Sequence, residues 1–210
     1  MSEDVLLPGF ESYLEGLLPK RDPVLADMEI HAEKNSFPIV GPLVGQFLMQ
    51  YARFIRPKRI LELGSGFGYS ALWFAKGAPD DVEIICTDFS KANVERAKSY
   101  FERAKIGRKI RFLVGDGLEL LKALEGEFDI IFNDVEKEDY PKVFRTAIPR
   151  LRKGGVLMTD NALWHGRVIK AAVDKATMGA KEYNHLAFND PRVLSTIVPI
   201  RDGLAVSVKL

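Results

Sequence analysis

The chain has 210 residues, which is enough for one domain with a full hydrophobic core, and 47% of them are apolar, as in ordinary globular proteins. Its net charge of +1 gives no electrostatic reason to expect binding to nucleic acid or to an anionic membrane, and its single cysteine excludes an intrachain disulfide. No apolar run has the length of a membrane span, and the acidic N-terminus lacks the pattern of a signal peptide, so a cytoplasmic location is expected.

The N-terminal segment, residues 1–56, has the periodicity of helices. Apolar residues in the leader, residues 1–21, favour a short helix that would pack on the domain or on a second subunit. Asp22 and Pro23 are residue types that begin helices. Helices are therefore expected within 1–21, from 22 to about 35 and at 40–55, ahead of a core formed by residues 57–210.

From residue 57 onward, strand patterns and helix patterns alternate, which predicts an α/β domain with a parallel sheet and helices on both faces. The last two strand patterns flank Arg201, Asp202 and Gly203, which are typical of the turn of an antiparallel hairpin. No linker or repeat divides the chain, so residues 1–210 are expected to form a single domain. The expected strands are 59–63, 83–87, 110–114, 128–133, 155–159, 194–200 and 204–209, and the expected core helices are 69–76, 91–104, 118–124, 140–151 and about 168–176.

A glycine-rich turn joins the first core strand to its helix, in the stretch RILELGSGFGYS. Gly64, Gly66 and Gly68 allow positive φ angles and close approach of a ligand, which would face the N–H groups of the following helix. The spacing is GxGxG, not the GxGxxG of dinucleotide sites, and a tight turn without a ligand would give the same pattern. Two carboxylates favour a cofactor. Glu62 is costly inside an apolar strand without a partner such as a ligand amine, and Asp88 ends the next strand, where an acid can bind both ribose hydroxyls.

Oxygen-bearing side chains follow two further strands. Asp134 closes the fourth strand, and Asp160 and Asn161 close the fifth. Neighbouring parallel strands lie about 5 Å apart, so these three side chains can converge. Each of them alone is also typical of a helix cap or a turn. Two carboxylates and an amide are hard oxygen donors, which suit Mg²⁺ or another divalent cation such as Ca²⁺ or Mn²⁺. Together, beside the glycine turn, they favour a cation site over caps and turns once the surrounding motif is also matched to a known family.

Three motifs, in order along the chain, resemble one enzyme family. LELGSGFGYS is similar to the cofactor motif of class I S-adenosylmethionine-dependent methyltransferases, and FNDVEKEDY and GGVLMTDNALWHGRV resemble the cation-dependent catechol and caffeoyl-CoA O-methyltransferases. The resemblance implies a Rossmann-like fold with a mostly parallel seven-stranded sheet, a C-terminal antiparallel hairpin and extra N-terminal helices. It also implies S-adenosylmethionine as cofactor, a small catechol-like or vicinal-diol aromatic substrate that is methylated on a hydroxyl, and a homodimer.

The resemblance assigns roles to further residues. Ser70 begins a helix, where its hydroxyl can bond a carboxylate. Asp116 is placed beside the adenine, although the same position suits a helix N-cap. Lys137 is the expected general base, because a nearby cation lowers the pKa of a lysine, although residues 136–139 also have the composition of a solvated charge run. The expected sites are catalytic Lys137 and Asp134; cofactor-binding Glu62, Gly64, Gly66, Gly68, Ser70, Asp88, Asp116, Gly117 and Asp134; and metal-binding Asp134, Asp160 and Asn161.

The chain departs from the family motif around the expected metal site. The usual relatives have Asp-Ala-Asp-Lys after an apolar residue, whereas this chain has Asn133 before Asp134 and then Val135, Glu136 and Lys137. None of these differences removes a ligand, but they change the surroundings of the substrate.

Two other functions remain open at this point. One is an NAD-type dehydrogenase, against which the missing third glycine and the terminal hairpin count. The other is a non-catalytic S-adenosylmethionine-binding module, against which the intact Asp134, Lys137, Asp160 and Asn161 count. The substrate wall is expected to come from the N-terminal helices, the loop after Trp164 and residues 179–191, with Trp164 either covering the substrate ring or packing in the core.

Overall fold

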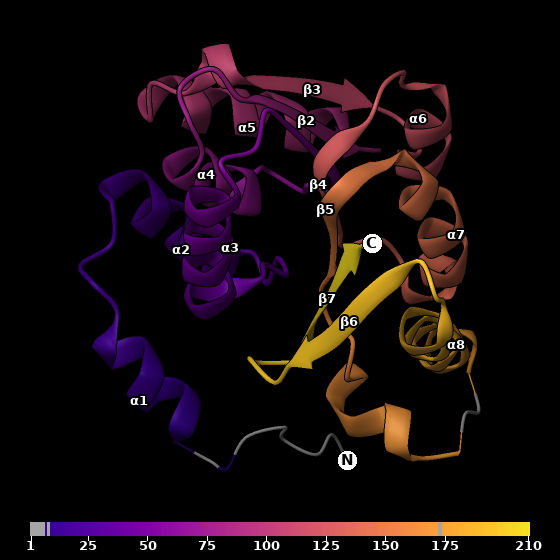
Figure 1. Cartoon of the computed structure of the whole chain (residues 1–210). Helices are drawn as coiled ribbons and strands as arrows, with labels where there is room; N and C mark the ends of the chain where they lie inside the picture. The colour runs from indigo at the N-terminus through magenta and orange to yellow at the C-terminus, as the bar shows by residue number, and fades with distance from the viewer. Residues whose placement is uncertain (1–6, 8, 172–173) are drawn as a thin grey trace.

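The computed structural model describes residues 7, 9–171 and 174–210, which form a seven-stranded sheet with helices on both faces. The strands are β1 (Arg59–Leu63), β2 (Glu83–Asp88), β3 (Ile110–Val114), β4 (Phe128–Asn133), β5 (Leu151–Thr159), β6 (Val193–Val198) and β7 (Leu204–Lys209). Their order is β3-β2-β1-β4-β5-β7-β6 (Figure 1). The first five are parallel, and β7 pairs antiparallel with both β5 and β6. The predicted sheet and its C-terminal hairpin are confirmed.

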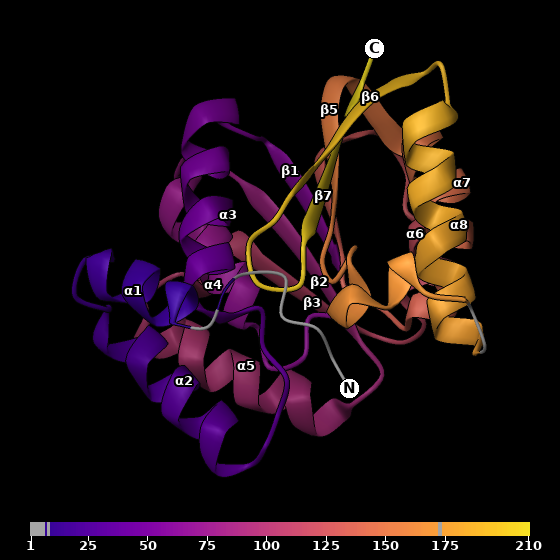
Figure 2. The ribbon, with the colours of Figure 1, turned by 90° about the horizontal axis from the view of Figure 1, so that it is seen from below.

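The helices divide between the two faces of this sheet, as Figure 2 shows. Those drawn on one side are α1 (Phe10–Leu17), α2 (Pro23–Lys34), α3 (Gly41–Ile55), α4 (Tyr69–Gly77) and α5 (Lys91–Arg103). Those on the other side are α6 (Gly117–Ala123), α7 (Tyr140–Arg150) and α8 (Lys175–Asn189). Three short 3₁₀ turns, η1 (Gly107–Lys109), η2 (Lys137–Asp139) and η3 (Trp164–Ile169), lie between elements.

Alternate residues of the central strands enter two separate hydrophobic cores. Ile60 and Ile130 pack on the side of α2 to α5, whereas Leu61 and Ile131 pack on the side of α7 and α8, and all four are fully buried. A strand covered on both faces is apolar along most of its length, which explains the nearly continuous apolar runs in the sequence. The carboxyl ends of these buried strands consequently meet at one edge of the sheet.

The N-terminal helices follow the sequence prediction closely. The side chain of Asp22 caps α2 by accepting a hydrogen bond of 2.9 Å from the N–H of Val24. The helix expected in the leader is α1, although residues 1–6 and 8 of that leader lie outside the described residues. No helix in the described ranges is both long and apolar enough to cross a membrane.

The helix expected at about 168–176 is wrong. Residues 164–169 form η3, in which Trp164 and His165 have positive φ angles of 46° and 51°, and residues 172–173 lie outside the described residues. The helix begins later, at Lys175, because the side chain of Asp174 caps it by accepting a 2.8 Å hydrogen bond from the N–H of Thr177. It then continues to Asn189, so residues 179–189, which were assigned to the substrate wall, belong to a packed helix.

Candidate active site

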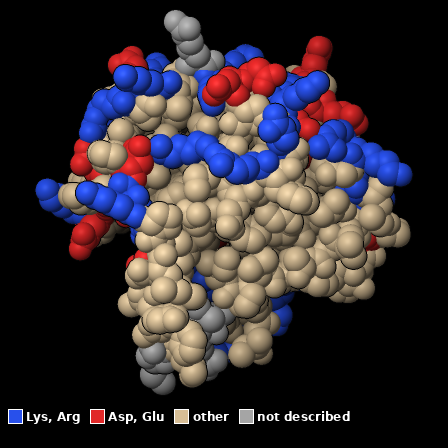
Figure 3. All heavy atoms as spheres, turned by 60° about the vertical axis from the view of Figure 1, so that its left-hand side comes forward, with Lys and Arg blue, Asp and Glu red and all other residues tan. Residues whose placement is uncertain are grey.

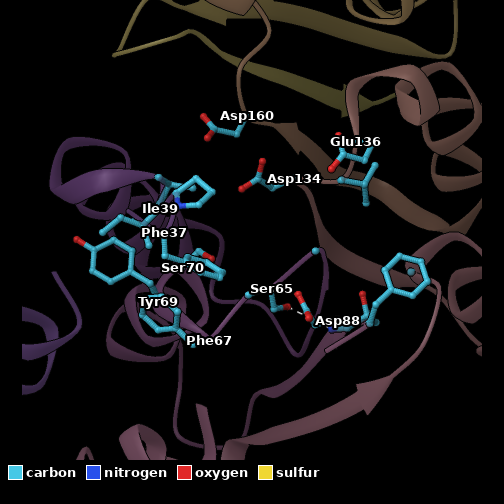
Figure 4. Close-up of a pocket in the computed structure, with 18 of the residues that line it drawn as sticks. Phe37, Ile39, Ser65, Phe67, Tyr69, Ser70, Asp88, Asp134, Glu136 and Asp160 are labelled. Carbon is cyan, nitrogen blue, oxygen red and sulfur yellow. Dashed lines mark hydrogen bonds between the residues drawn. The ribbon is translucent and has the colours of Figure 1, made fainter. Parts of the chain in front are cut away.

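A pocket of about 320 Å³ lies at the carboxyl edge of the sheet, where β1, β2, β4 and β5 end. This volume is within the range of small-molecule sites. In Figure 4, Asp134 and Asp160 lie close together at one end of the pocket, and Ser65 and Asp88 lie at the other. The predicted site residues that line it are Gly64, Gly66, Ser70, Asp88, Gly117, Asp134, Lys137, Asp160 and Asn161. Glu62, Gly68 and Asp116 were also predicted for the site, but their atoms do not line this pocket.

The glycine turn brings two of these strand ends into contact. Gly64 has a φ of +81°, and a Cβ atom there would lie 2.4 Å from the carbonyl oxygen of Asp134. Such a distance is a steric clash with backbone, so only glycine fits. Gly66 has a φ of +51°, and its Cβ would lie 2.9 Å from the ring of Phe37. The glycines therefore let the turn approach both the end of β4 and the segment between α2 and α3.

Asp88 fastens the glycine turn to the end of β2. Its Oδ2 accepts a 3.0 Å hydrogen bond from the N–H of Gly66, and its Oδ1 accepts from the N–H of Ser90 at 2.8 Å and from Nδ2 of Asn93 at 3.1 Å. The carboxylate also lines the pocket. It is thus held in place by the protein before any ligand arrives.

Glu62 already has partners inside the protein. The hydroxyl of Ser70 donates to Oε1, and Sγ of Cys86 donates to Oε2 at 3.6 Å. The side chain is fully buried, and burial raises its pKa from 4.5 to about 7. Glu62 therefore supports Ser70, which faces the pocket, instead of reaching a ligand directly.

The buried carboxyl of Glu62 predicts a pH dependence of stability. Its pKa is about 7 in the fold and 4.5 for the free side chain, so the folded protein binds more protons than the unfolded chain between these values. Unfolding free energy should fall by about 3 kcal/mol as pH rises through this window. The variant Glu62→Gln should lack this part of the slope in urea unfolding at pH 5 and pH 8. Parallel pH profiles for the two proteins would contradict the raised pKa.

Asp116 is the N-cap of α6, which was one of its two predicted roles. Its Oδ1 accepts from the N–H of Leu118 at 2.8 Å and from the N–H of Glu119 at 3.3 Å, and the residue is exposed. Gly117 lines the pocket, and its Cβ would lie 3.0 Å from Oγ1 of Thr87. The predicted contact of Asp116 with adenine stays a prediction.

Asp134 and Asp160 form a pair of carboxylates, and the positive charges of Lys137 and Arg201 act on both of them. Asp160 is only 5% exposed, and the Asp134 side chain is 27% exposed. Burial raises the pKa of both carboxyl groups, and the charge of Asp134 raises the pKa of Asp160 further. One ammonium group, Nζ of Lys137, lies 3.5 Å from Oδ1 of Asp134.

This pair fits a divalent cation. Asn161, with a φ of +52°, follows Asp160 and lines the same pocket, so it adds a third oxygen donor. Within residues 7, 9–171 and 174–210, no group of three or more His, Cys, Asp or Glu side chains has the arrangement of a metal site. A cation bound here would therefore need the amide of Asn161 or oxygens of a ligand in addition to the two carboxylates.

Lys137 is held by contacts on several sides. Its ammonium lies 5.5 Å from the ring centres of both Tyr140 and Trp164, which is the distance of a cation–π contact. Trp164 therefore flanks the predicted base, and it does not line the pocket as a substrate cover would. The backbone of Lys137 rests on α8, where a Cβ added to Gly179 would lie 2.2 Å from its carbonyl oxygen.

The contact of Gly179 with Lys137 predicts the effect of a single added methyl group. In Gly179→Ala, the Cβ would clash with the backbone of Lys137 and Glu138, so η2 has to shift. We expect a loss of about 2 kcal/mol of stability and at least a tenfold fall in kcat, because Lys137, the predicted base, moves relative to Asp134. Gly107→Ala is the matched control, since nothing lies within 4 Å of its Cβ. A wild-type kcat in Gly179→Ala would contradict the expected role of this contact.

Several residues of the pocket were missed from the sequence. Phe37, Pro38 and Ile39 form one wall, and Phe89 stands at another edge with 74% of its surface exposed. A helix break at Phe37-Pro38 and an apolar residue directly after Asp88 were the available signals. Arg201 fixes the first wall, because its Nη1 donates to the carbonyl of Ile39 at 2.8 Å, and this long-range contact left no pattern in the sequence.

Comparison with known proteins decides the family. A sequence profile of the O-methyltransferase family matches residues 21–210. The chain belongs to this family. This O-methyltransferase family member is similar to the catechol O-methyltransferase of Niastella koreensis, with 28% identity over 95% of this chain and 97% of the relative. It is similar to caffeoyl-CoA O-methyltransferase 2 of Eucalyptus globulus, with 31% identity over 77% of this chain and 71% of the relative.

The fold is shared as well. The crystal structure of an O-methyltransferase from Bacillus cereus in complex with SAH has a TM-score of 0.87 and 26% identity, and covers 95% of this chain and 96% of that one. The sheet order with its terminal hairpin is thus that of the class I methyltransferases. The family resemblance and the fold predicted from the three motifs are both confirmed.

Proposed function

We propose that the protein is an S-adenosylmethionine- and divalent-cation-dependent O-methyltransferase that methylates one hydroxyl of a small vicinal-diol aromatic compound. The observation that supports this most strongly is that Asp134 and Asp160 lie together at one end of the pocket, whereas Ser65 of the glycine turn and Asp88 lie at the other (Figure 4). Asn161 lines the same pocket, and Nζ of Lys137 lies 3.5 Å from Oδ1 of Asp134. A cofactor at the glycine turn and a cation at the carboxylates would both face the same cavity. The names of the relatives, catechol O-methyltransferase and caffeoyl-CoA O-methyltransferase, support the proposed class of substrate.

The residues divide the work as follows. The glycine turn and Asp88 would bind S-adenosylmethionine, which supplies an electrophilic methyl group when bound. Asp134, Asp160 and Asn161 would hold a cation, which when bound polarises a substrate hydroxyl and fixes its direction. Lys137 would accept the proton of that hydroxyl. The wall formed by Phe37, Pro38 and Ile39 would exclude water from the pocket. The protein would then accelerate the reaction mainly by positioning and by electrostatic stabilisation.

The proposal includes a homodimer. Helix α1 has no buried residue in the monomer, and Phe10, Tyr13 and Leu17 on it are more than half exposed. Figure 3 shows that positive and negative side chains interleave over the upper part of this side of the molecule, whereas the lower part is largely uncharged. Exposed aromatic residues on a helix with no buried residue favour a protein partner over nucleic acid.

Methyl transfer itself tests this proposal. The protein is incubated with methyl-labelled S-adenosylmethionine and a panel of catechols, first with Mg²⁺ and then with a chelator, and parallel titrations measure binding of S-adenosylmethionine and of NAD. We expect label in the product that disappears with the chelator, and binding of S-adenosylmethionine without binding of NAD. Transfer that is unaffected by the chelator would exclude the cation mechanism, and binding of NAD alone would overturn the proposal in favour of a dehydrogenase.

A further inference from the structure

Four neighbouring strands, β4, β5, β7 and β6, carry a strip of polar side chains on the face of the sheet that α8 covers. Asn133 on β4, Thr159 on β5 and Ser207 on β7 are fully buried, and Ser195 on β6 continues the strip. Asn133 is the register partner of Thr159, and Ser195 is the register partner of Ser207. The surrounding core is apolar, and polar side chains in such a place cost free energy unless they form hydrogen bonds.

The members of this strip contact one another. Nδ2 of Asn133 donates to Oγ1 of Thr159 at 3.3 Å, and the hydroxyls of Ser195 and Ser207 lie 2.7 Å apart. The side chain of Tyr183 on α8 lies beside Thr159 and Ser207. Burial raises the pKa of Tyr183 to about 12, whereas the hydroxyls of Thr159 and Ser207 lower it. Oδ1 of Asn133 and the phenol oxygen of Tyr183 have no direct hydrogen-bond partner of good geometry. An apolar residue at position 133 would avoid this cost, so packing alone does not explain Asn133.

At one end of the strip, its residues are next in the chain to the two pocket carboxylates. Asn133 immediately precedes Asp134, and Thr159 immediately precedes Asp160. The N–H of Asp160 also donates to the carbonyl of Asn133 at 3.1 Å. The ends of β4 and β5 are therefore joined by two hydrogen bonds, one between backbone groups and one between the side chains of Asn133 and Thr159. Both bonds lie next to the residues that carry the pocket carboxylates.

The hydrogen bond between Asn133 and Thr159 can hold the two strand ends at a fixed separation. Two buried carboxylates of like charge repel each other, and a strand end that is held only by backbone hydrogen bonds can fray. A cation site requires the ligand oxygens at a fixed spacing before the cation binds, and outer residues that orient the ligands commonly set the affinity.

We propose that Asn133, through its contact with Thr159 beneath Tyr183, is a positioning residue that fixes the separation of Asp134 and Asp160 for one divalent cation. This inference rests on the cation assignment of the proposed function. It adds that the polar residue at position 133, where the usual relatives have an apolar one, belongs to the cation site of this chain.

The test compares cation binding in four variants of the full chain. Asn133→Leu replaces the amide by an apolar group with the same branching, and Thr159→Val replaces the hydroxyl by a methyl group. Thr159→Ser keeps the hydroxyl, and Ser195→Ala removes a polar contact at the far end of the same strip. The probe is Mn²⁺, whose binding is measured by electron paramagnetic resonance with and without S-adenosylhomocysteine. Binding of S-adenosylhomocysteine and the unfolding midpoint are recorded for each variant.

We expect Asn133→Leu and Thr159→Val to weaken Mn²⁺ binding by about 10-fold to 100-fold, with Thr159→Ser and Ser195→Ala within about twofold of the wild type. Affinity for S-adenosylhomocysteine should be unchanged in all four. Wild-type Mn²⁺ affinity in Asn133→Leu and Thr159→Val would overturn the proposal and leave the proposed function intact, as would an equal loss in Ser195→Ala. If Asn133→Leu does not fold, Thr159→Val and Thr159→Ser decide the question. A wild-type protein that does not bind Mn²⁺ would overturn the cation assignment, and the positioning role with it.

Discussion

Replacing Asp160 by alanine is expected to lower cation-stimulated methyl transfer about 1,000-fold, since polarisation by a bound cation is worth several kcal/mol in such reactions. Cofactor binding should change little, because Asp160 lies at the opposite end of the pocket from Asp88. The same variant should be more stable than the wild type at pH 8 in the presence of a chelator. In the wild type, burial and the charge of Asp134 raise the pKa of the Asp160 carboxyl. Above that pKa the ionised carboxylate therefore destabilises the fold, and the variant lacks it.

Three measurements check the Asp160→Ala prediction: turnover against Mg²⁺ concentration, calorimetric titration with S-adenosylhomocysteine, and thermal unfolding with chelator at pH 8. Asp80→Ala is the matched control, because this fully exposed carboxylate forms only a 2.9 Å surface ion pair with Lys109. Full activity in Asp160→Ala would refute the metal assignment. Loss of activity together with loss of cofactor binding and stability would show that the carboxylate serves the fold and not the cation.

Replacing Lys137 by methionine is expected to lower kcat by a factor of about 100 to 10,000, the usual contribution of a general base. Methionine keeps most of the apolar stem that lies beside the rings of Tyr140 and Trp164, so the fold should be retained. Cation affinity should not fall, because the ammonium of Lys137 at 3.5 Å competes with a cation for the carboxylate of Asp134.

The role of Lys137 as a base also predicts how the defect responds to pH. Hydroxide replaces a missing general base increasingly well as pH rises, so the ratio of wild-type to variant kcat should shrink between pH 7 and pH 9.5. Lys142→Met is the control, since its exposed ammonium pairs with Asp139 at 2.6 Å and takes no part in the pocket. A variant Lys137→Met with kcat within fivefold of the wild type would exclude general-base catalysis by this residue.

The parts of the site that lie at strand ends could be predicted from the sequence. Gly64, Asp88, Asp134 and Asp160 each follow a short apolar run, and parallel strands that alternate with helices bring such positions to one edge. Their roles still depended on matching whole motifs, because a lone acid after a strand is equally typical of a helix cap. Asp116, which caps α6, illustrates this ambiguity.

The parts that depend on packing could not be predicted. The partners of Glu62 are Ser70 and Cys86, and only the fold brings those two side chains to one carboxylate. The prediction of a helix at about 168–176 missed most of α8, in which the lack of a side chain at Gly179 lets η2 approach. Asn133 showed only as a departure from a motif, and its contact with Thr159 depends on strand register.

The most direct measurement of the central claim is a crystal structure of the protein with S-adenosylhomocysteine, Mn²⁺ and a catechol, with data collected at the manganese absorption edge. The proposed function predicts one anomalous peak between Asp134, Asp160 and Asn161, both catechol oxygens within bonding distance of that peak, and one of them facing the sulfur of the cofactor and Nζ of Lys137. An anomalous peak elsewhere, or a catechol bound in the pocket with no metal at these three residues, would contradict the cation-dependent mechanism.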